Sequence, residues 1–188
     1  MRVISGNFKG KKIQQPKDDK TRPLKDLAKE SIFNILKHSK KINFDLTDAH
    51  VLDLFSGVGS FGIECLSRGA RKVIFIENYL NVLPVLKKNL ENLKLFKNFE
   101  VINKDIYKDD LFEILKYKFN IIFLDPPYRD KNLDILFEKI INLDIIEKNG
   151  IVILHRHKSE KDIFPPKFKI IEKREYGISK IMFLIFLQ

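Results

Sequence analysis

Short apolar runs alternate with segments of helical spacing along most of the chain. The runs are rich in β-branched and aromatic residues, which is typical of buried strands. They occupy Val51–Phe55, Val73–Ile76, Phe99–Ile102, Ile121–Leu124 and Ile151–Leu154. This alternation predicts an α/β domain built on a mainly parallel sheet.

Helices are predicted between these strands. They cover Ser60–Arg68, Leu80–Leu95, Asp109–Lys116 and Leu133–Asn142. Pro84 would kink the second helix if it lay in the interior, because proline has no N–H to donate. A cap at Asn81 would place Pro84 in the first turn, where the missing N–H costs little. We therefore expect either a kink at Pro84 or a helix start capped by Asn81.

Both ends of the chain depart from the alternation. Phe168–Glu175 and Ile181–Leu187 are two strand-like runs close together, so they predict an antiparallel hairpin at the end of the sheet. Arg2–Ile13 alternates loosely and predicts a small β-hairpin. Residues 16–23 form a charged linker, and apolar positions then recur at helical spacing over residues 24–36.

The positive charge is concentrated in the first part of the chain. The net charge of the 188 residues is +10, and residues 1–41 hold 12 Lys/Arg against 4 Asp/Glu. A basic segment beside a nearly neutral body suits a phosphate-rich partner, since each neutralised phosphate releases counterions. A merely solvated arm is the alternative.

We therefore divide the chain into a basic nucleic-acid-binding extension, residues 1–41, and a second domain, residues 42–188, which together form one compact unit. The expected phosphate ligands are Arg2, Lys9, Lys11, Lys12 and Arg22.

No membrane span or secretion signal is expected. The longest apolar run, Ile181–Leu187, is far shorter than the ~20 residues that a membrane helix requires. The chain starts at Met1 without the hydrophobic stretch of a secretory signal. Cys65 is the only cysteine and is expected to be buried, which excludes an internal disulfide and a cysteine-based zinc site. These observations predict a cytoplasmic protein.

The histidines do not predict a metal site. His38, His50, His155 and His157 share no metal-ligand spacing with acids or with Cys65. Ordinary surface or capping roles are expected for them.

A glycine-rich segment, Asp53-Leu54-Phe55-Ser56-Gly57-Val58-Gly59-Ser60-Phe61-Gly62, leads from the first predicted strand into a helix. Its glycines allow the backbone to approach a ligand closely, as in a cofactor turn. Gly57, Gly59 and Gly62 match the dinucleotide fingerprint, and Glu77 is placed to bind ribose hydroxyls. A turn needed only for packing a strand against a helix is the alternative.

Acids at the strand ends favour a methyl donor over a dinucleotide. Asp53 would repel a pyrophosphate, but it suits the cationic amino group of S-adenosylmethionine. Asp105 could accept a hydrogen bond from the adenine amino group, although an ordinary turn aspartate is equally compatible with this position. Ile106 could pack on the adenine ring, and Phe55 is expected to touch the cofactor. These side chains would line one crevice at the carboxyl ends of the strands.

Asp125-Pro126-Pro127-Tyr128 follows the fourth predicted strand. Its two prolines hold the backbone rigid. Asp125 and the Pro126 carbonyl could accept N–H bonds from an aromatic amine and so favour the geometry of methyl transfer. Tyr128 offers a flat surface for a base taken out of its stack. A rigid turn beside a core tyrosine is the alternative interpretation.

The chain resembles the bacterial 16S ribosomal RNA (guanine-N2)-methyltransferases of the RsmD type. The resemblance rests on Arg2-Val3-Ile4-Ser5-Gly6, Lys9-Gly10-Lys11, Thr21-Arg22-Pro23, Glu30-Ser31-Ile32-Phe33-Asn34-Ile35-Leu36, Asp53 to Gly62, Leu66-Ser67-Arg68-Gly69-Ala70, Phe75-Ile76-Glu77, Asp125 to Tyr128 and Tyr176-Gly177. The N-terminal blocks are its most specific part. Leu24 and Lys25 depart from the small hydroxylated residues of the family, and Asn78 replaces a charged residue.

The resemblance implies a Rossmann-like seven-stranded methyltransferase sheet with a reversed last strand. It also implies S-adenosylmethionine as donor, S-adenosylhomocysteine as product, and a guanine of 16S ribosomal RNA as target, in naked RNA or in an assembling small-subunit particle. We expect a monomer without a metal. The alternatives are a DNA adenine-N6 methyltransferase, a nicotinamide oxidoreductase suggested by the glycines alone, and an RNA-binding module without catalysis.

Overall fold

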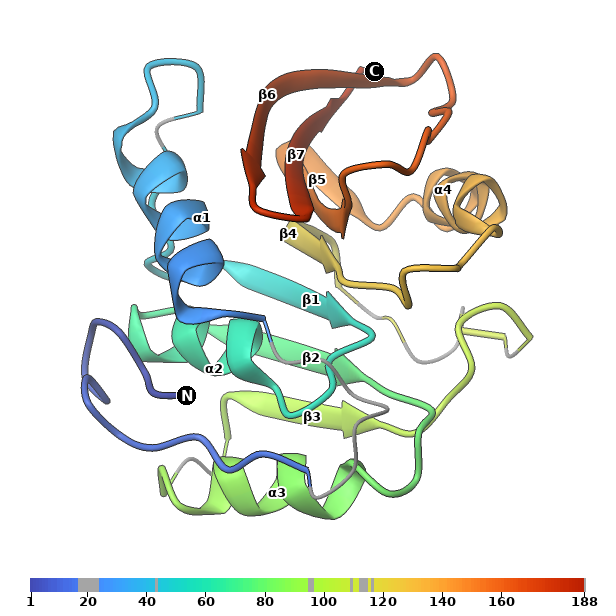
Figure 1. Ribbon diagram of the computed structural model, residues 1–188. Helices are drawn as coiled ribbons and strands as arrows, with labels where there is room; N and C mark the ends of the chain where they lie inside the picture. Colours follow the sequence, from blue (N-terminus) through green and yellow to red (C-terminus); the bar gives the residue numbers. More distant parts are fainter. Residues whose placement is uncertain are drawn as a thin grey trace.

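The computed structural model describes residues 1–16, 24–42, 44–94, 97–108, 110–111, 115 and 117–187. These residues form a sheet of seven strands in the order β3-β2-β1-β4-β5-β7-β6 (Figure 1). The strands are β1 His50–Leu54, β2 Lys72–Ile76, β3 Phe99–Ile102, β4 Phe119–Leu124, β5 Ile146–His157, β6 Phe168–Tyr176 and β7 Ser179–Phe186. The helices are α1 Asp26–His38, α2 Ser60–Ser67, α3 Leu83–Glu91 and α4 Leu133–Asn142.

The sheet is parallel except at one edge. Strand β1 pairs in parallel with β2 and with β4, whereas β7 is antiparallel to both β5 and β6. The predicted fold class, including the antiparallel C-terminal hairpin, is confirmed. The order reverses between β1 and β4, and open α/β sheets bind their ligands at such a point.

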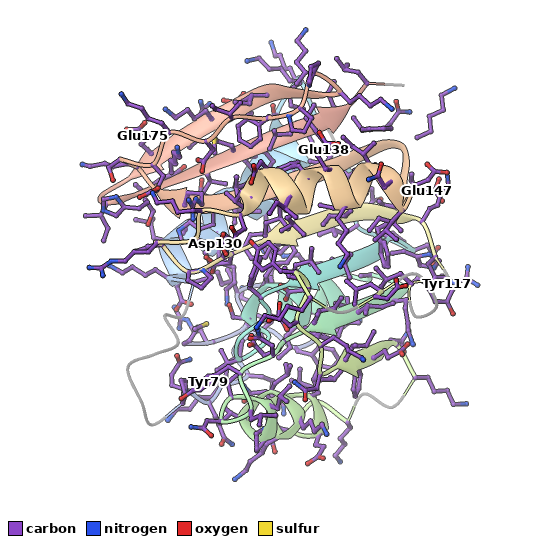
Figure 2. All side chains as sticks on the ribbon, turned by 90° about the vertical axis from the view of Figure 1, so that its right-hand side faces the viewer. Tyr79, Tyr117, Asp130, Glu138, Glu147 and Glu175 are labelled. Atoms are coloured by element: carbon purple, nitrogen blue, oxygen red, sulfur yellow. The ribbon has the colours of Figure 1, made fainter. Side chains whose placement is uncertain are left out.

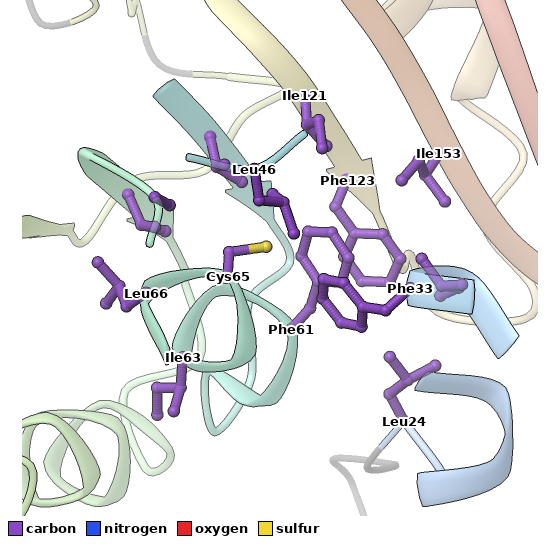
Figure 3. Close-up of a cluster of buried hydrophobic side chains, with 14 of the residues drawn as sticks. Leu24, Phe33, Leu46, Phe61, Ile63, Cys65, Leu66, Ile121, Phe123 and Ile153 are labelled. Carbon is purple, nitrogen blue, oxygen red and sulfur yellow. The ribbon is translucent and has the colours of Figure 1, made fainter. Parts of the chain in front are cut away.

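Helices cover both faces of the sheet (Figure 1). Alternate residues of each strand point to opposite faces, so Val51 of β1 packs with α1, α2 and α3 while Leu52 packs with α4. On the first face three aromatic rings stack in sequence (Figure 3). The Phe33 and Phe61 centroids are 5.4 Å apart, and those of Phe61 and Phe123 are 4.0 Å apart. This stack fixes α1 and α2 on the sheet.

Some predicted boundaries were wrong. Helix α3 begins after Val82 rather than at Asn81, whose side chain donates to the Tyr79 hydroxyl instead. Pro84 nevertheless lies in the first turn, as predicted. Strand β5 is much longer than the predicted Ile151–Leu154. The predicted helix Asp109–Lys116 lies largely outside the described residues.

The N-terminal segment is docked along α2 and α3. The small hairpin predicted over Arg2–Ile13 is present in a short form: Arg2 and Lys12 form an antiparallel bridge, and the Val3 and Ile13 N–H groups donate to the Lys11 and Met1 carbonyls at 2.9 and 3.0 Å. The Ile4 and Ser5 N–H groups donate to the buried Glu64 carboxylate at 2.7 and 2.9 Å. Gly6 has φ +81°, and a Cβ there would lie 1.9 Å from the Ser67 carbonyl oxygen, so only glycine fits.

Two buried side chains complete this attachment. The Lys29 ammonium donates to the Arg2 carbonyl at 2.7 Å, and Asn89 exchanges hydrogen bonds with the Gln14 backbone at 2.8 and 3.1 Å.

The division of the chain into two domains at residue 41 stays a prediction. Among the described residues, no helix is both long enough and apolar enough to cross a bilayer.

Candidate active site

Strands β1 and β4 bring the two predicted motifs to the same edge of the sheet. We call residues 53–62 the glycine-rich loop and residues 125–130 the Asp-Pro-Pro-Tyr loop. Leu54 and Leu124 are paired neighbours, and the Asp125 N–H reaches the Leu54 carbonyl at 3.5 Å. The two loops therefore begin side by side, at the carboxyl ends of adjacent parallel strands.

The glycine-rich loop is held by backbone strain and by a carboxylate. Phe55 has φ +60°, a conformation that bulky residues rarely adopt and that is common at functional sites. The Gly57 N–H donates to Glu77 Oε2 at 2.7 Å, and the Tyr79 N–H donates to Oε1 at 2.8 Å. Gly59, at φ +80°, could not carry a Cβ because it would lie 2.4 Å from Leu86.

Asp53 is the first residue of this loop, and its side chain is buried. It is 1% exposed, and its carboxylate accepts the Gly62 N–H at 3.0 Å. Burial raises the pKa of Asp53 well above its usual value, and the charges of Asp125 and Glu77 add to this effect, while the Gly62 hydrogen bond opposes it. Its predicted contact with a cofactor amino group stays a prediction.

A pocket of about 140 Å³ opens between the two loops. Its walls are Phe55, Ile76, Glu77, Asn78, Lys104, Asp105, Ile106, Tyr107, Pro127 and Asp130. Phe55, Glu77, Asp105 and Ile106 were predicted from the sequence as cofactor ligands. The pocket therefore gathers residues that follow β1, β2, β3 and β4, including Pro127 of the Asp-Pro-Pro-Tyr loop.

Asp105 stands at the wall of this pocket. Slight desolvation acts to raise its pKa, but the Tyr107 N–H bond, at 3.0 Å, and the charge of Lys108 together lower it. A hydrogen bond from Asn78 acts in the same direction. Asp105 is thus a carboxylate at neutral pH, able to accept further hydrogen bonds.

Tyr107 was not predicted as a site residue. Its ring centroid lies 6.0 Å from that of Phe55, and its hydroxyl donates to Asp130 Oδ2 at 2.8 Å. Figure 2 shows Asp130 on the segment that leads into α4. Burial, followed by the hydrogen bond to Asp130, raises the pKa of Tyr107, so it remains protonated. Its position two residues after Asp105, a predicted cofactor ligand, could have identified Tyr107 as a site residue.

Two histidines contact predicted catalytic residues: His155 contacts Asp125, and His157 contacts Tyr128. Asp125 Oδ1 lies 2.8 Å from Nδ1 of His155, which is 6% exposed, so the predicted surface or capping role of His155 was wrong. Burial acts to lower the pKa of His155, but the charge and hydrogen bond of Asp125 raise it overall. The Tyr128 ring meets the His157 ring edge-on at 5.4 Å, and its hydroxyl lies 3.3 Å from Ser179 Oγ.

The predicted phosphate ligands lie away from the pocket. Arg2, Lys9, Lys11 and Lys12 are exposed, and Arg22 lies outside the described residues. The Phe8 N–H donates to Ser67 Oγ at 2.9 Å, so this turn sits at the C-terminal end of α2. The turn therefore lies at the opposite end of α2 from Ser60, where the glycine-rich loop enters the helix.

The reversal of strand order beside an acid-lined pocket, with an Asp-Pro-Pro-Tyr loop on the next strand, is the arrangement of S-adenosylmethionine-dependent methyltransferases. Residues 1–185 match the family described as Conserved hypothetical protein 95, and the chain belongs to that family. The resemblance drawn from the sequence is thereby confirmed.

Individual relatives agree with this assignment. A candidate rRNA methyltransferase of Bacillus subtilis, YlbH, is 34% identical over 96% of both chains. Ribosomal RNA small subunit methyltransferase D of Haemophilus influenzae is 30% identical over 95% of this chain and 90% of its own. The structure of a candidate methyltransferase of Escherichia coli has a TM-score of 0.80 at 25% identity, covering 100% of this chain and 98% of that one.

Proposed function

We propose that this protein transfers a methyl group from S-adenosylmethionine to the N2 amine of a guanine in the 16S ribosomal RNA of the small subunit. It is an enzyme, and its relatives are named as methyltransferases of ribosomal RNA. The guanine target is supported by the N-terminal sequence blocks and by the Asp-Pro-Pro-Tyr loop. The observation that carries the proposal is the shared origin of Asp125 and the glycine-rich loop on adjacent strands.

The walls of the pocket suit S-adenosylmethionine. Phe55 and Ile106 offer apolar surfaces to the adenine ring, and Asp105 would accept a hydrogen bond from its amino group. Glu77 keeps lone pairs for ribose hydroxyls beside its two backbone bonds, and Asp53 would attract the cationic amino group. When bound, the sulfonium supplies an electrophilic methyl group.

The Asp-Pro-Pro-Tyr loop would activate the acceptor. An aromatic amine is a poor nucleophile because its lone pair is delocalised into the ring. Asp125 and the Pro126 carbonyl would accept its two N–H bonds, which favours the pyramidal nitrogen and the positive charge that develop during transfer. Tyr128 would stack on the extruded base, a contact worth about 1–3 kcal/mol.

The exposed basic residues would hold RNA away from the target base. Arg2, Lys9, Lys11 and Lys12 are exposed, and none of them lines the pocket. They would therefore bind phosphates several nucleotides from the guanine. We further propose that the protein acts as a cytoplasmic monomer, on naked RNA or on an assembling particle.

The test uses a labelled methyl donor with separate pools of naked ribosomal RNA, small-subunit particles and DNA. Mass spectrometry then identifies the modified nucleoside. N2-methylguanosine from 16S RNA or the particles is the expected product. N6-methyladenine from the DNA pool would support the rival target. Donor binding without a product in any pool would indicate an RNA-binding module.

A further inference from the structure

Three consecutive residues at the end of β5 each meet a different part of the Asp-Pro-Pro-Tyr loop. His155 bonds to Asp125, and the His157 ring abuts Tyr128. Between them, Arg156 Nη1 donates to the Pro127 carbonyl at 3.1 Å. The hydrogen-bonded pairs are 29 and 30 positions apart in the sequence. None of the three β5 residues belongs to a motif identified from the sequence.

Arg156 braces the loop from within the protein. It is 2% exposed, and its Nη2 donates to the Asp130 carbonyl at 2.9 Å. The same turn closes on itself, because the Asp130 N–H donates to the Pro127 carbonyl at 2.9 Å. The planar guanidinium therefore holds both ends of the turn in one fixed geometry, which a flexible ammonium could not reproduce.

Acids and a second cation hold Arg156 in turn. Its Nε donates to Asp162 Oδ1 at 3.1 Å, and the other oxygen of Asp162 lies 2.9 Å from the Lys180 ammonium. Lys180 is 5% exposed and pairs across the sheet with Arg156. A buried arginine with charged partners and carbonyl acceptors has little rotamer freedom. The brace is therefore rigid.

The histidines fix the two reactive side chains. Nδ1 of His155 binds Oδ1 of Asp125, which limits the rotation of this carboxylate. The edge contact with His157 and the hydroxyl contact with Ser179 restrict the Tyr128 ring. His157 and Ser179 are paired neighbours on β5 and β7, so the antiparallel edge of the sheet sets this geometry.

We propose that His155, Arg156 and His157 form a positioning segment that sets the Asp-Pro-Pro-Tyr loop at the distance and angle required for methyl transfer. This inference rests on the proposed function. A misplacement near 1 Å can lower a rate about 10²-fold, so loss of this segment should act on kcat. The glycine-rich loop has separate supports, but Pro127 and Asp130 also line the pocket, so donor affinity should fall less than kcat.

Two pairs of variants test the segment. Arg156→Met removes both carbonyl contacts, and Arg156→Lys keeps only the charge. His155→Leu removes the bond to Asp125, whereas His155→Asn keeps a donor near the position of Nδ1. Single-turnover rates, RNA KM and the affinity for S-adenosylhomocysteine are measured for each. Lys29→Met is the matched control, because Lys29 is also a buried cation but contacts the N-terminal segment.

We expect kcat to fall about 10–100-fold in Arg156→Met and His155→Leu, less in Arg156→Lys, and within about 3-fold of wild type in His155→Asn. RNA KM should stay near wild type, and Lys29→Met should keep its kcat. Donor affinity should stay near wild type in the His155 variants and fall less than kcat in Arg156→Met, because Arg156 holds Pro127 and Asp130 of the pocket wall. Wild-type kcat in His155→Leu, or equal losses in His155→Leu and His155→Asn, would overturn the inference. If Arg156→Met does not fold, the His155 pair decides. A wild-type enzyme inactive on every RNA would refute the proposed function instead.

Discussion

The glycine-rich loop and the Asp-Pro-Pro-Tyr loop leave neighbouring strands but are held by opposite chemistry. Carboxylates hold the first: Asp53 and Glu77 accept backbone N–H groups of Gly62 and Gly57. A cation holds the second, because Arg156 donates to backbone carbonyls of its turn. Acids therefore gather where a cationic donor would bind, whereas the buried cation Arg156 holds the loop that carries Asp125 and Tyr128.

The supports of the two loops also come from different parts of the chain. Of the two acids that hold the glycine-rich loop, Asp53 lies in β1 and Glu77 directly follows β2, both within the parallel part of the sheet. The brace of the Asp-Pro-Pro-Tyr loop comes from β5, on the edge where the sheet turns antiparallel. Each loop thus has its own support, and each should fail separately when that support is removed.

Asp125→Ala should give the largest difference between the effect on kcat and the effect on donor affinity. The variant should lose roughly 10²–10³ in kcat, because the acceptor amine loses its charged partner. S-adenosylhomocysteine affinity, measured by calorimetry, should stay close to wild type, since the glycine-rich loop is unchanged. Full activity in a folded Asp125→Ala protein would refute the role of this carboxylate.

Glu77→Ala should give the converse result. Without the carboxylate, the Gly57 and Tyr79 N–H groups lose their partner, which costs about 1–3 kcal/mol. Donor affinity should then fall about 10–100-fold, with kcat at saturating donor less affected. Calorimetry and donor-saturated rates separate the two effects. A variant with normal donor affinity and a collapsed kcat would contradict the separate supports.

Asp53→Asn should weaken donor binding and stabilise the folded protein. The raised pKa of Asp53 means that its ionised form costs folding free energy above the ordinary pKa of aspartate and does not at lower pH. Asparagine keeps the acceptor for the Gly62 N–H without the charge. We expect a higher Tm at neutral pH and weaker donor binding. An unchanged Tm at neutral pH would count against a buried charge at Asp53.

The smallest expected effect is the pH dependence from His155. Because its folded pKa is raised, the pair with Asp125 stabilises the protein fully below about pH 6.5, and this contribution is lost as pH rises through the folded pKa. Tm values measured near pH 6 and pH 8 should differ less in His155→Asn than in wild type. Parallel profiles for the two proteins would rule out this linkage.

Much of the pocket wall could be predicted from the sequence, whereas the β5 residues that hold the Asp-Pro-Pro-Tyr loop could not. Phe55, Glu77, Asp105 and Ile106 lie within a few residues of buried apolar runs, so a strand-end rule locates them. Strand β5 extends past the predicted Leu154, and only its pairing with β7 reveals where the next residues point. Register depends on tertiary packing, which no local pattern of His155 or Arg156 encodes.

The docked N-terminal segment also sets an order of events during translation. Ile4 bonds to Glu64, 60 positions later, and Gln14 to Asn89, 75 positions later. In a nascent chain the bond to Glu64 cannot form before α2 has been synthesised, and the bond to Asn89 cannot form before α3 has been synthesised. Contacts between such distant positions also slow folding. Attachment of the first residues can thus be complete only after Asn89 has been synthesised.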